Sequence, residues 1–262
     1  MTLSVNWTML TEPTTIMLLY TAALGGRVEM LPRLMTRIRQ ERAAHAGPAL
    51  LVDLGRSCEG GGWLCEATDG RGMLVTMDAM GYDAFHIGAA DALYSQPAVV
   101  QQLRQVINTP LAAGPWFGKA TRKGLICCFA ARFDVMLNAA AQAQDQAQRK
   151  VEGEIELSAP PELPDLLIAL QLGAYPRTDI ESYGETRLLT LDAGWATGTE
   201  PLLGRLDIAL TPESPYISVQ SQTRLAVPDT LLPDPSIIGV IEFVESEARY
   251  VQRKRGSIDQ SG

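Results

Sequence analysis

Histidine is scarce in this sequence, which contains only His45 and His86 among 262 residues. No Ser–His–Asp set is visible, and the chain has no glycine fingerprint of the kind that binds phosphate. The run Gly60-Gly61-Gly62 indicates a flexible loop rather than an anion-binding nest. The sequence therefore offers no ready-made catalytic motif.

Cysteine is also sparse, and no two cysteines form a CxxC pair. The four residues are Cys58, Cys65, Cys127 and Cys128. Because no secretory signal is visible, we expect free buried thiols. A zinc site built from Cys58, Cys65, His45 and His86 is an alternative, although these spacings match no zinc motif. A thiol-based sensor at Cys58 or Cys65 is a further alternative.

Long apolar runs are absent as well. No stretch reaches the roughly 18 to 20 apolar residues that span a bilayer. The most apolar early run, residues 16–24, is preceded by no lysine or arginine, so it lacks the basic start of a secretory signal. We interpret this run as a core strand and expect a cytoplasmic protein without membrane contact.

Positive charge is outweighed by negative charge. Lys and Arg number 22 against 30 Asp and Glu, which gives a net charge of −8. An acidic chain is repelled by nucleic acid and by anionic membranes, so neither is expected as a partner. Hydrophobic residues make up 46% of the chain, which suffices for a large core and excludes wholesale disorder.

The first half of the chain alternates between strand and helix patterns. We predict strands over residues 15–21, 49–54, 84–87 and 109–113, and helices over 27–44, 73–80 and 98–107. Strands that alternate with helices of this length pair in parallel through right-handed crossovers. In open sheets of this kind, ligands bind beyond the carboxyl ends of the strands. Of residues 88–91, which follow the third strand, only Asp91 carries a functional side chain.

The second half is less regular. We predict strands over 125–129, 166–170, 187–191, 203–210 and 216–225, an Ala/Gln-rich helix or excursion over 139–150, and a helix from 234 to about 250. Residues 1–14 are interpreted as a leader, 15–250 as a single domain and 251–262 as a polar tail. No internal repeat and no clean linker is visible.

Several blocks together resemble a known family. They are YTAALGGRVEMLPRLMTRIRQER, LLVDLGRSCEGG, MLVTMDAMGYDAFHIGAAD and the pair LLTLDAGW and LLGRLDIALT. Their order and spacing are similar to those of the calcineurin-like metallophosphoesterases, specifically the catalytic domain of the 5′-nucleotidase-like branch. The resemblance extends from about residue 15 to residue 250. It implies an α/β (α+β sandwich) fold in which two mixed β-sheets are flanked by helices.

The same resemblance implies two metal ions held by loops at the strand ends. The family places Asp-x-His after the first strand, Gly-Asp after the second, Gly-Asn-His after the third, a histidine after a later strand, and then Gly-His-x-His. This chain has other residues at these positions, and residues 173–186 contain no histidine. The degenerate metal-ligand positions are Ala23, Gly25, Arg56, Ala89, Ala90 and Gln171.

We therefore expect a non-catalytic protein of this fold, with no metal and no cofactor, that acts as a scaffold or binds a small anion. Arg56 replaces an acid, so it would supply a fixed positive charge suited to phosphate or carboxylate. The ligand would be a phosphate-bearing small molecule, and an unknown protein partner is the alternative. The expected anion-binding residues are Arg56, Ser57, Gly25, Gly26 and Gln171. The alternative, of equal weight, is that Arg56 pairs with Asp91 and only fills the empty site.

Two further interpretations concern acids and one buried histidine. A metal-dependent phosphoesterase with a rebuilt site remains an alternative, with Glu59, Glu66, Asp69 and Asp91 as ligands. Asp53 lies inside a strand, where a structural hydrogen-bonding role is expected rather than catalysis. On an apolar strand, His86 is interpreted as a core histidine.

Overall fold

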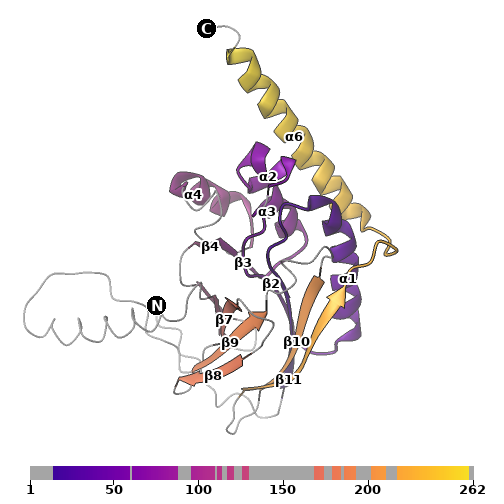
Figure 1. Ribbon diagram of the computed structural model, residues 1–262, viewed down its shortest axis with the longest axis vertical. Helices are drawn as coiled ribbons and strands as arrows, with labels where there is room; N and C mark the ends of the chain where they lie inside the picture. Colours follow the sequence, from indigo (N-terminus) through magenta and orange to yellow (C-terminus); the bar gives the residue numbers. More distant parts are fainter. Residues whose placement is uncertain are drawn as a thin grey trace, which may run out of the picture. The chain divides into compact units, whose positions relative to one another are not determined.

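The computed structural model describes residues 14–59, 61–87, 96–109, 111–113, 117–120, 126–129, 168–173, 179–183, 186–192, 202–210 and 217–259. The chain forms two compact units (Figure 1). The larger unit comprises Leu10–Leu111 and Ala193–Gly262, and the smaller unit comprises Met1–Met9 and Ala112–Asp192. Each unit draws on separate stretches of the chain, which explains why no single linker in the sequence divides them.

A six-stranded sheet forms the centre of the larger unit, in the order β11-β10-β1-β2-β3-β4, and its edge strand β4 belongs to this unit only at Leu111. Its strands are β1 (Thr14–Thr21), β2 (Ala49–Asp53), β3 (Ala84–Ile87), β4 (Leu111–Ala113), β10 (Leu202–Leu210) and β11 (Ile217–Ala226). β1, β2 and β3 are parallel neighbours, as predicted. β10 and β11 add antiparallel pairs, so this sheet is mixed.

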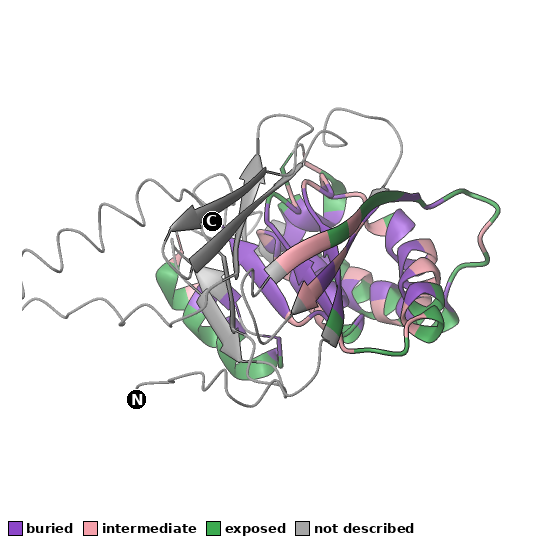
Figure 2. Ribbon diagram, turned by 90° about the horizontal axis from the view of Figure 1, so that it is seen from below, coloured by how far each residue is buried: buried purple, intermediate pink, exposed green. Residues whose placement is uncertain are grey.

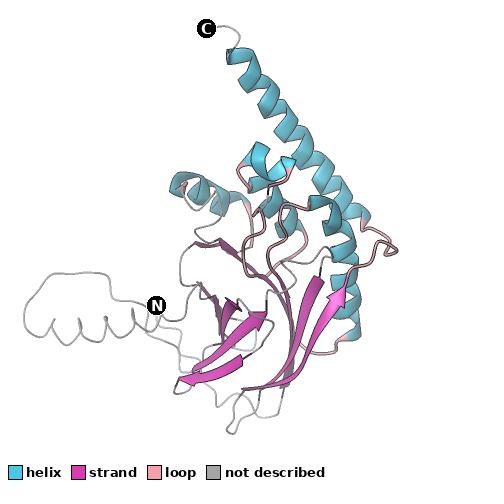
Figure 3. Cartoon of the chain, in the orientation of Figure 1, coloured by secondary structure: helices cyan, strands magenta, loops and turns pink. Residues whose placement is uncertain are grey.

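The helices of the larger unit follow the apolar periodicity of the sequence. They are the short 3₁₀ helix η2 (Val28–Met30), α1 (Leu31–Ala44), α2 (Trp63–Thr68), α3 (Arg71–Ala79), α4 (Pro97–Val106) and α6 (Pro235–Asp259) (Figure 3). On α1 the apolar stripe that includes Leu31, Leu34 and Ile38 is fully buried. Each such side chain stabilises the fold by about 1.5–3 kcal/mol relative to exposure. Gly81 lies just after the end of α3 and has a φ of 74°, the left-handed conformation that is typical of a glycine at a helix end.

The core lies between the helices and β1, β2 and β3. Met17, Leu19, Leu51 and Phe85 from these strands belong to one cluster with the buried faces of α1 and α3. Figure 2 colours the buried parts of the chain purple. β1 is buried on its other face as well, which is why it is an almost continuous apolar run rather than an alternating one. The interpretation of residues 16–24 as a core strand is confirmed for β1.

The smaller unit contains a five-stranded sheet in the order β5-β6-β7-β9-β8. Its strands are β5 (Phe117–Ala120), β6 (Ile126–Phe129), β7 (Ile168–Gly173), β8 (Asp179–Tyr183) and β9 (Thr186–Asp192). β6, β7 and β9 are parallel, whereas β5 and β8 pair antiparallel at the edges. This sheet is therefore also mixed, and the chain has an α/β fold.

Four features differ from the sequence predictions. α2, β5 and β8 were not predicted, and α6 continues to Asp259 although residues 251–262 were interpreted as a polar tail. Lys, Arg and Gln are good helix formers, so a polar composition does not end a helix that is already anchored upstream. Residues 1–13 and 139–150 lie outside the described part of the chain. None of the described helices combines the length and apolar content needed to cross a bilayer.

Candidate functional site

The loops that follow β1 and β2 are joined by backbone hydrogen bonds. The Ala23 amide donates to the Gly55 carbonyl at 2.9 Å, and the Gly26 amide donates to the Ser57 carbonyl at 2.7 Å. The two parallel strands end side by side, so their loops meet at one edge of the sheet. The structure thus brings together four of the predicted site residues, Gly25, Gly26, Arg56 and Ser57.

Both loops contain non-glycine residues in the left-handed region of the backbone map. Ala23 has a φ of 50° and Arg56 has a φ of 61°. This conformation costs an L-residue about 1–2 kcal/mol, and such residues cluster at functional sites. Ala23 and Arg56 are also two of the positions at which the resemblance implied metal ligands. Both positions therefore combine a strained backbone with a side chain that is neither a carboxylate nor an imidazole.

Glycine is required where the two loops touch. A Cβ on Gly26 would lie 2.8 Å from the carbonyl carbon of Gly61 and 3.3 Å from the Cα of Gly62. A Cβ on Gly62 would in turn lie 2.7 Å from the Gly26 oxygen. The loop after β2 is therefore packed directly on the Gly26 backbone, with no room for a side chain between them.

A buried hydrogen-bond network around Asp53 holds the end of β2. The Thr21 hydroxyl donates to Oδ2 of Asp53 at 2.6 Å, while the Ser57 hydroxyl and the Gly55 amide donate to Oδ1 at 2.7 and 2.9 Å. Because Thr21 uses its only proton on Asp53, Tyr82 must be the donor in the 3.0 Å contact between their hydroxyls. The predicted structural role of Asp53 is confirmed.

The pKa of Tyr82 agrees with this direction of donation. Burial raises the pKa of the Tyr82 phenol far above its ordinary range, and the nearby charge of Asp53 raises it further. Tyr82 therefore keeps its proton and remains a donor. The network also limits the candidate site, because the Ser57 hydroxyl proton is used on Asp53 and is not available to an anion in this arrangement.

Arg56 forms an ion pair with Glu59, three residues further along the same loop. The contact joins Nε of Arg56 to Oε2 of Glu59, and both side chains are partly exposed, at 44% and 39%. The hydrogen bond from Arg56 holds the pKa of the Glu59 carboxyl below its usual value. Glu59, proposed as a metal ligand in the rebuilt-site alternative, is therefore engaged by a cation.

The remaining predicted residues are scattered. Gln171 lies in β7 of the smaller unit, opposite Thr190 of β9. Glu66 lies in α2, and Asp69 caps the carboxyl end of that helix with a φ of 52°. Ala89, Ala90 and Asp91 lie outside the described residues.

The described residues contain no group of three or more His, Cys, Asp or Glu side chains placed to hold a metal ion. His86 is buried in β3, as predicted for a core histidine. A Cβ on Gly55 would lie 3.0 Å from its Nδ1, so the imidazole packs against the loop after β2.

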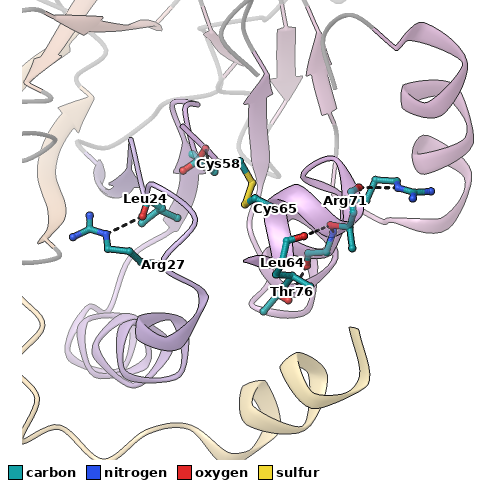
Figure 4. The surroundings of a disulfide bond; sticks show 11 residues. Leu24, Arg27, Cys58, Leu64, Cys65, Arg71 and Thr76 are labelled. Atoms are coloured by element: carbon teal, nitrogen blue, oxygen red, sulfur yellow. Dashed lines mark hydrogen bonds between the residues drawn. A yellow bond between two sulfur atoms is a disulfide. The ribbon is translucent and has the colours of Figure 1, made fainter. Parts of the chain in front are cut away.

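Cys58 and Cys65 form a disulfide bond, which sequence reasoning missed (Figure 4). Their Cα atoms are 5.7 Å apart, within the range for a disulfide. The chain turns back between them through Gly61 and Gly62, whose φ values are 94° and 106°. The expectation of free thiols is therefore wrong for this pair, and the alternative zinc site and the thiol sensor lose both cysteines in this oxidised form. Cys127 and Cys128 lie in β6.

The comparison with known proteins concerns the fold. Neither a protein-family model nor a curated protein matches the sequence. Among solved structures, a calcineurin-like phosphoesterase from Bacillus subtilis matches with a TM-score of 0.52 and 11% identity, over 92% of this chain and 100% of that one. The chain has the metallophosphoesterase fold.

Two proteins from Thermus thermophilus share this metallophosphoesterase fold. A 5′-nucleotidase precursor matches with a TM-score of 0.52 and 11% identity, over 91% of this chain and 59% of that one. A sulfate thiohydrolase in complex with glycerol matches with a TM-score of 0.50 and 12% identity, over 88% of this chain and 60% of that one. The chain thus spans about three fifths of the length of these two proteins. At such identities the backbone fold is what the proteins share.

Proposed function

We propose that this chain is a non-catalytic protein of the metallophosphoesterase fold that acts as a scaffold or binds a small anion beside Arg56. Its two mixed sheets would pack as the sandwich that the resemblance implies, and the protein would be cytoplasmic. The observation that carries the proposal is the pair of left-handed residues at the strand ends. Ala23 offers no side-chain ligand, and Arg56 is a cation at the position where the resemblance implies a metal-bridging acid.

The electrostatics of the two loops support the absence of a metal. Divalent metals need several oxygen or imidazole ligands that converge on one point, and a guanidinium at that point repels them. Both oxygens of Asp53 already accept hydrogen bonds from Thr21, Gly55 and Ser57. The acceptors nearest to the strand ends are thus engaged within the protein.

Arg56 is the group best suited to an anion. Its planar guanidinium matches carboxylate and phosphate oxygens, and the side chain is accessible. The Gly26 amide and the Ser57 hydroxyl are bonded internally, so we place the main contact on Arg56, with Gly25 beside it. An incoming phosphate would compete with Glu59, and an unknown protein partner that presents a carboxylate would use the same chemistry.

A metal and activity assay tests the catalytic part of the proposal. Protein purified without chelator should contain no stoichiometric metal and should hydrolyse neither nucleotides nor phosphodiesters in manganese above a protein-free blank. Two metal ions per chain, with turnover abolished by Asp91→Ala, would instead establish the rebuilt-site hydrolase. Asp229→Ala is the matched control, because it removes an acid whose side chain is 100% exposed.

A thermal-shift series with inorganic phosphate tests the anion site. Phosphate should raise the Tm of the wild type, Arg56→Ala should abolish the rise, and Arg56→Lys should retain part of it. Arg33→Ala removes another arginine that is paired with an acid, and it should leave the rise intact. If phosphate and nucleotides raise the Tm of neither the wild type nor any variant, Arg56 only closes the loop through Glu59. The protein would then be a scaffold that binds no anion at this site.

A further inference from the structure

Helix α6 is held to the larger unit by one apolar stripe. The buried residues Ile237, Ile241, Val244 and Ala248 recur at alternating spacings of four and three, the pattern of a helix-packing seam. Val244 and Ala248 pack with Leu64 of α2. The amino end is fixed by Asp234, whose Oδ1 accepts the Ser236 amide at 3.0 Å. This stripe accounts for the helix as far as Ala248.

Helix α6 continues beyond Ala248. Residues 249–253 are all exposed, and the helix ends only at Asp259. The 11 residues from Arg249 to Asp259 rise by about 16 Å at the α-helical rise of about 1.5 Å per residue. Figure 1 shows this end of α6 projecting past α2. Within its own unit, this end of the helix is contacted at Arg249, whose guanidinium lies 5.1 Å from the centroid of the Trp63 ring of α2. The exposed residues 250–253 gain no stability from burial in this unit, which indicates that they pack elsewhere.

A second stripe runs along the exposed side of the same helix. It has the same four-and-three spacing, and all its members are exposed: Gly239, Phe243, Ser246, Tyr250 and Arg253. Phe243 is 60% exposed and Tyr250 is 62% exposed. A Cβ on Gly239 would meet nothing within 4 Å, so this side of the helix is open. Exposed aromatic residues at seam spacing mark a surface that packs against another helix.

Charge along α6 is separated into two blocks. Acids occupy positions 242, 245 and 247, and bases occupy positions 249, 253, 254 and 255. In an antiparallel pair of such helices centred on Ala248, positions 242–247 of one helix lie opposite positions 249–254 of the other. Each acidic block then faces a basic block, whereas a parallel pair would set like charges together.

We propose that α6 pairs antiparallel with α6 of a second copy of this chain through the exposed stripe. Around the two-fold axis, Tyr250 lies opposite Ser246 of the partner subunit, and Phe243 lies opposite Arg253 of the partner subunit. Large residues thus face small or flexible ones, and the contact is repeated by symmetry. An anionic lipid surface suits the basic block but not the adjacent acids or the net charge of −8.

The test is the oligomeric state of the full chain, measured by sedimentation or light scattering over a range of protein concentrations. The wild type should form a dimer. Phe243→Ser and Tyr250→Ser should each weaken the dimer by about tenfold or more, which corresponds to about 1.4 kcal/mol. Val106→Ser is the matched control, because Val106 is 71% exposed on α4, outside the proposed interface. It should leave the dimer unchanged.

Charge variants distinguish this arrangement from other contacts. A basic variant, Glu242→Lys with Glu247→Lys, and an acidic variant, Arg249→Glu with Lys254→Glu, should each be monomeric alone, because these positions lie opposite one another in the proposed pair. Mixed in equal amounts, they should form a heterodimer. Circular dichroism checks that both remain folded, as expected for Glu242, Glu247 and Arg249, which are exposed.

Three results would overturn the proposal. The first is a wild type that stays monomeric at all concentrations, and the second is a failure of the two charge variants to associate on mixing. The third is a Val106→Ser variant whose dimer is as weak as that of Phe243→Ser. A monomer that binds vesicles of anionic lipid through residues 249–255 would assign α6 to a membrane surface instead.

Discussion

The Gly26 amide donates a hydrogen bond to the Ser57 carbonyl at 2.7 Å, and this bond ties the loop after β1 to the loop after β2. The same glycine lies against the backbone of Gly61 and Gly62. One residue therefore holds both the strand-end loops and the segment between the two bonded cysteines. The geometry around Arg56 depends on this contact.

Gly26→Ala is expected to destabilise the protein strongly. A methyl group at this position would overlap the Gly61 backbone, and the φ of 73° is unfavourable for alanine. Together these effects should cost about 2–4 kcal/mol, measured by urea unfolding. Gly239→Ala is the control, because its Cβ would meet nothing within 4 Å and alanine favours a helix. If Gly26→Ala unfolded with the same free energy as Gly239→Ala, the two loops would be able to move apart without a loss of stability.

Removal of the Asp53 carboxylate should be more harmful than removal of any one of its donors. In Asp53→Ala, the Thr21 and Ser57 hydroxyls and the Gly55 amide lose their acceptor inside the protein. Each unsatisfied buried group costs about 1–3 kcal/mol, so the total should exceed about 3 kcal/mol. Ser57→Ala removes one donor and should cost about 1 kcal/mol. If denaturant unfolding showed that Asp53→Ala and Ser57→Ala lose similar free energies of unfolding, the proposed role of this hydrogen-bond network would be contradicted.

The parallel order of β1, β2 and β3 was predictable from the sequence because apolar runs and helical periodicity are local signals. That order also placed Gly25 next to Arg56, since parallel strands end at one edge. Asp53 was recognisable because an acid within an apolar strand needs internal donors. These inferences required only the alternation of elements along the chain.

The Cys58–Cys65 bond and the length of α6 were not predictable in the same way. The two cysteines are seven positions apart in the sequence, and their approach depends on the turn through Gly61 and Gly62. The polar residues after Tyr250 were interpreted as a tail because the apolar stripe that is buried earlier in the helix does not continue there. A helix that extends into solvent has no burial pattern in the sequence that marks its end.

Reduction of the Cys58–Cys65 bond should lower stability. A cross-link that closes a loop of this length contributes about 2–3 kcal/mol through the unfolded state. Dithiothreitol should therefore lower the Tm of the wild type and leave the Cys58→Ser, Cys65→Ser double variant unchanged. Thiol labelling of the unreduced, denatured protein should find two fewer reactive thiols than the four cysteines of the sequence.

The same labelling also bears on cellular location. Disulfides persist in oxidising compartments and are rare in the cytosol. If protein trapped with acid from cells labels at all four cysteines, the bond is absent there, which is what the predicted cytoplasmic location requires. An oxidised pair in the trapped protein would argue for another compartment.

Asp234 should make the attachment of α6 sensitive to acid. Burial alone would raise its pKa, but hydrogen bonds from Ser236 and the charge of Arg39 outweigh burial and hold the pKa of Asp234 below its ordinary value. A carboxyl with a lowered folded pKa stabilises the protein fully above its unfolded pKa of about 3.9, and this contribution is lost as pH falls further. The Tm difference between wild type and Asp234→Asn should therefore be largest near neutral pH and shrink below about pH 4. Asp229→Asn, at an exposed site, should show no such difference at any pH. A wild-type advantage that persists undiminished into strong acid would mean that Asp234 holds α6 by shape rather than by charge.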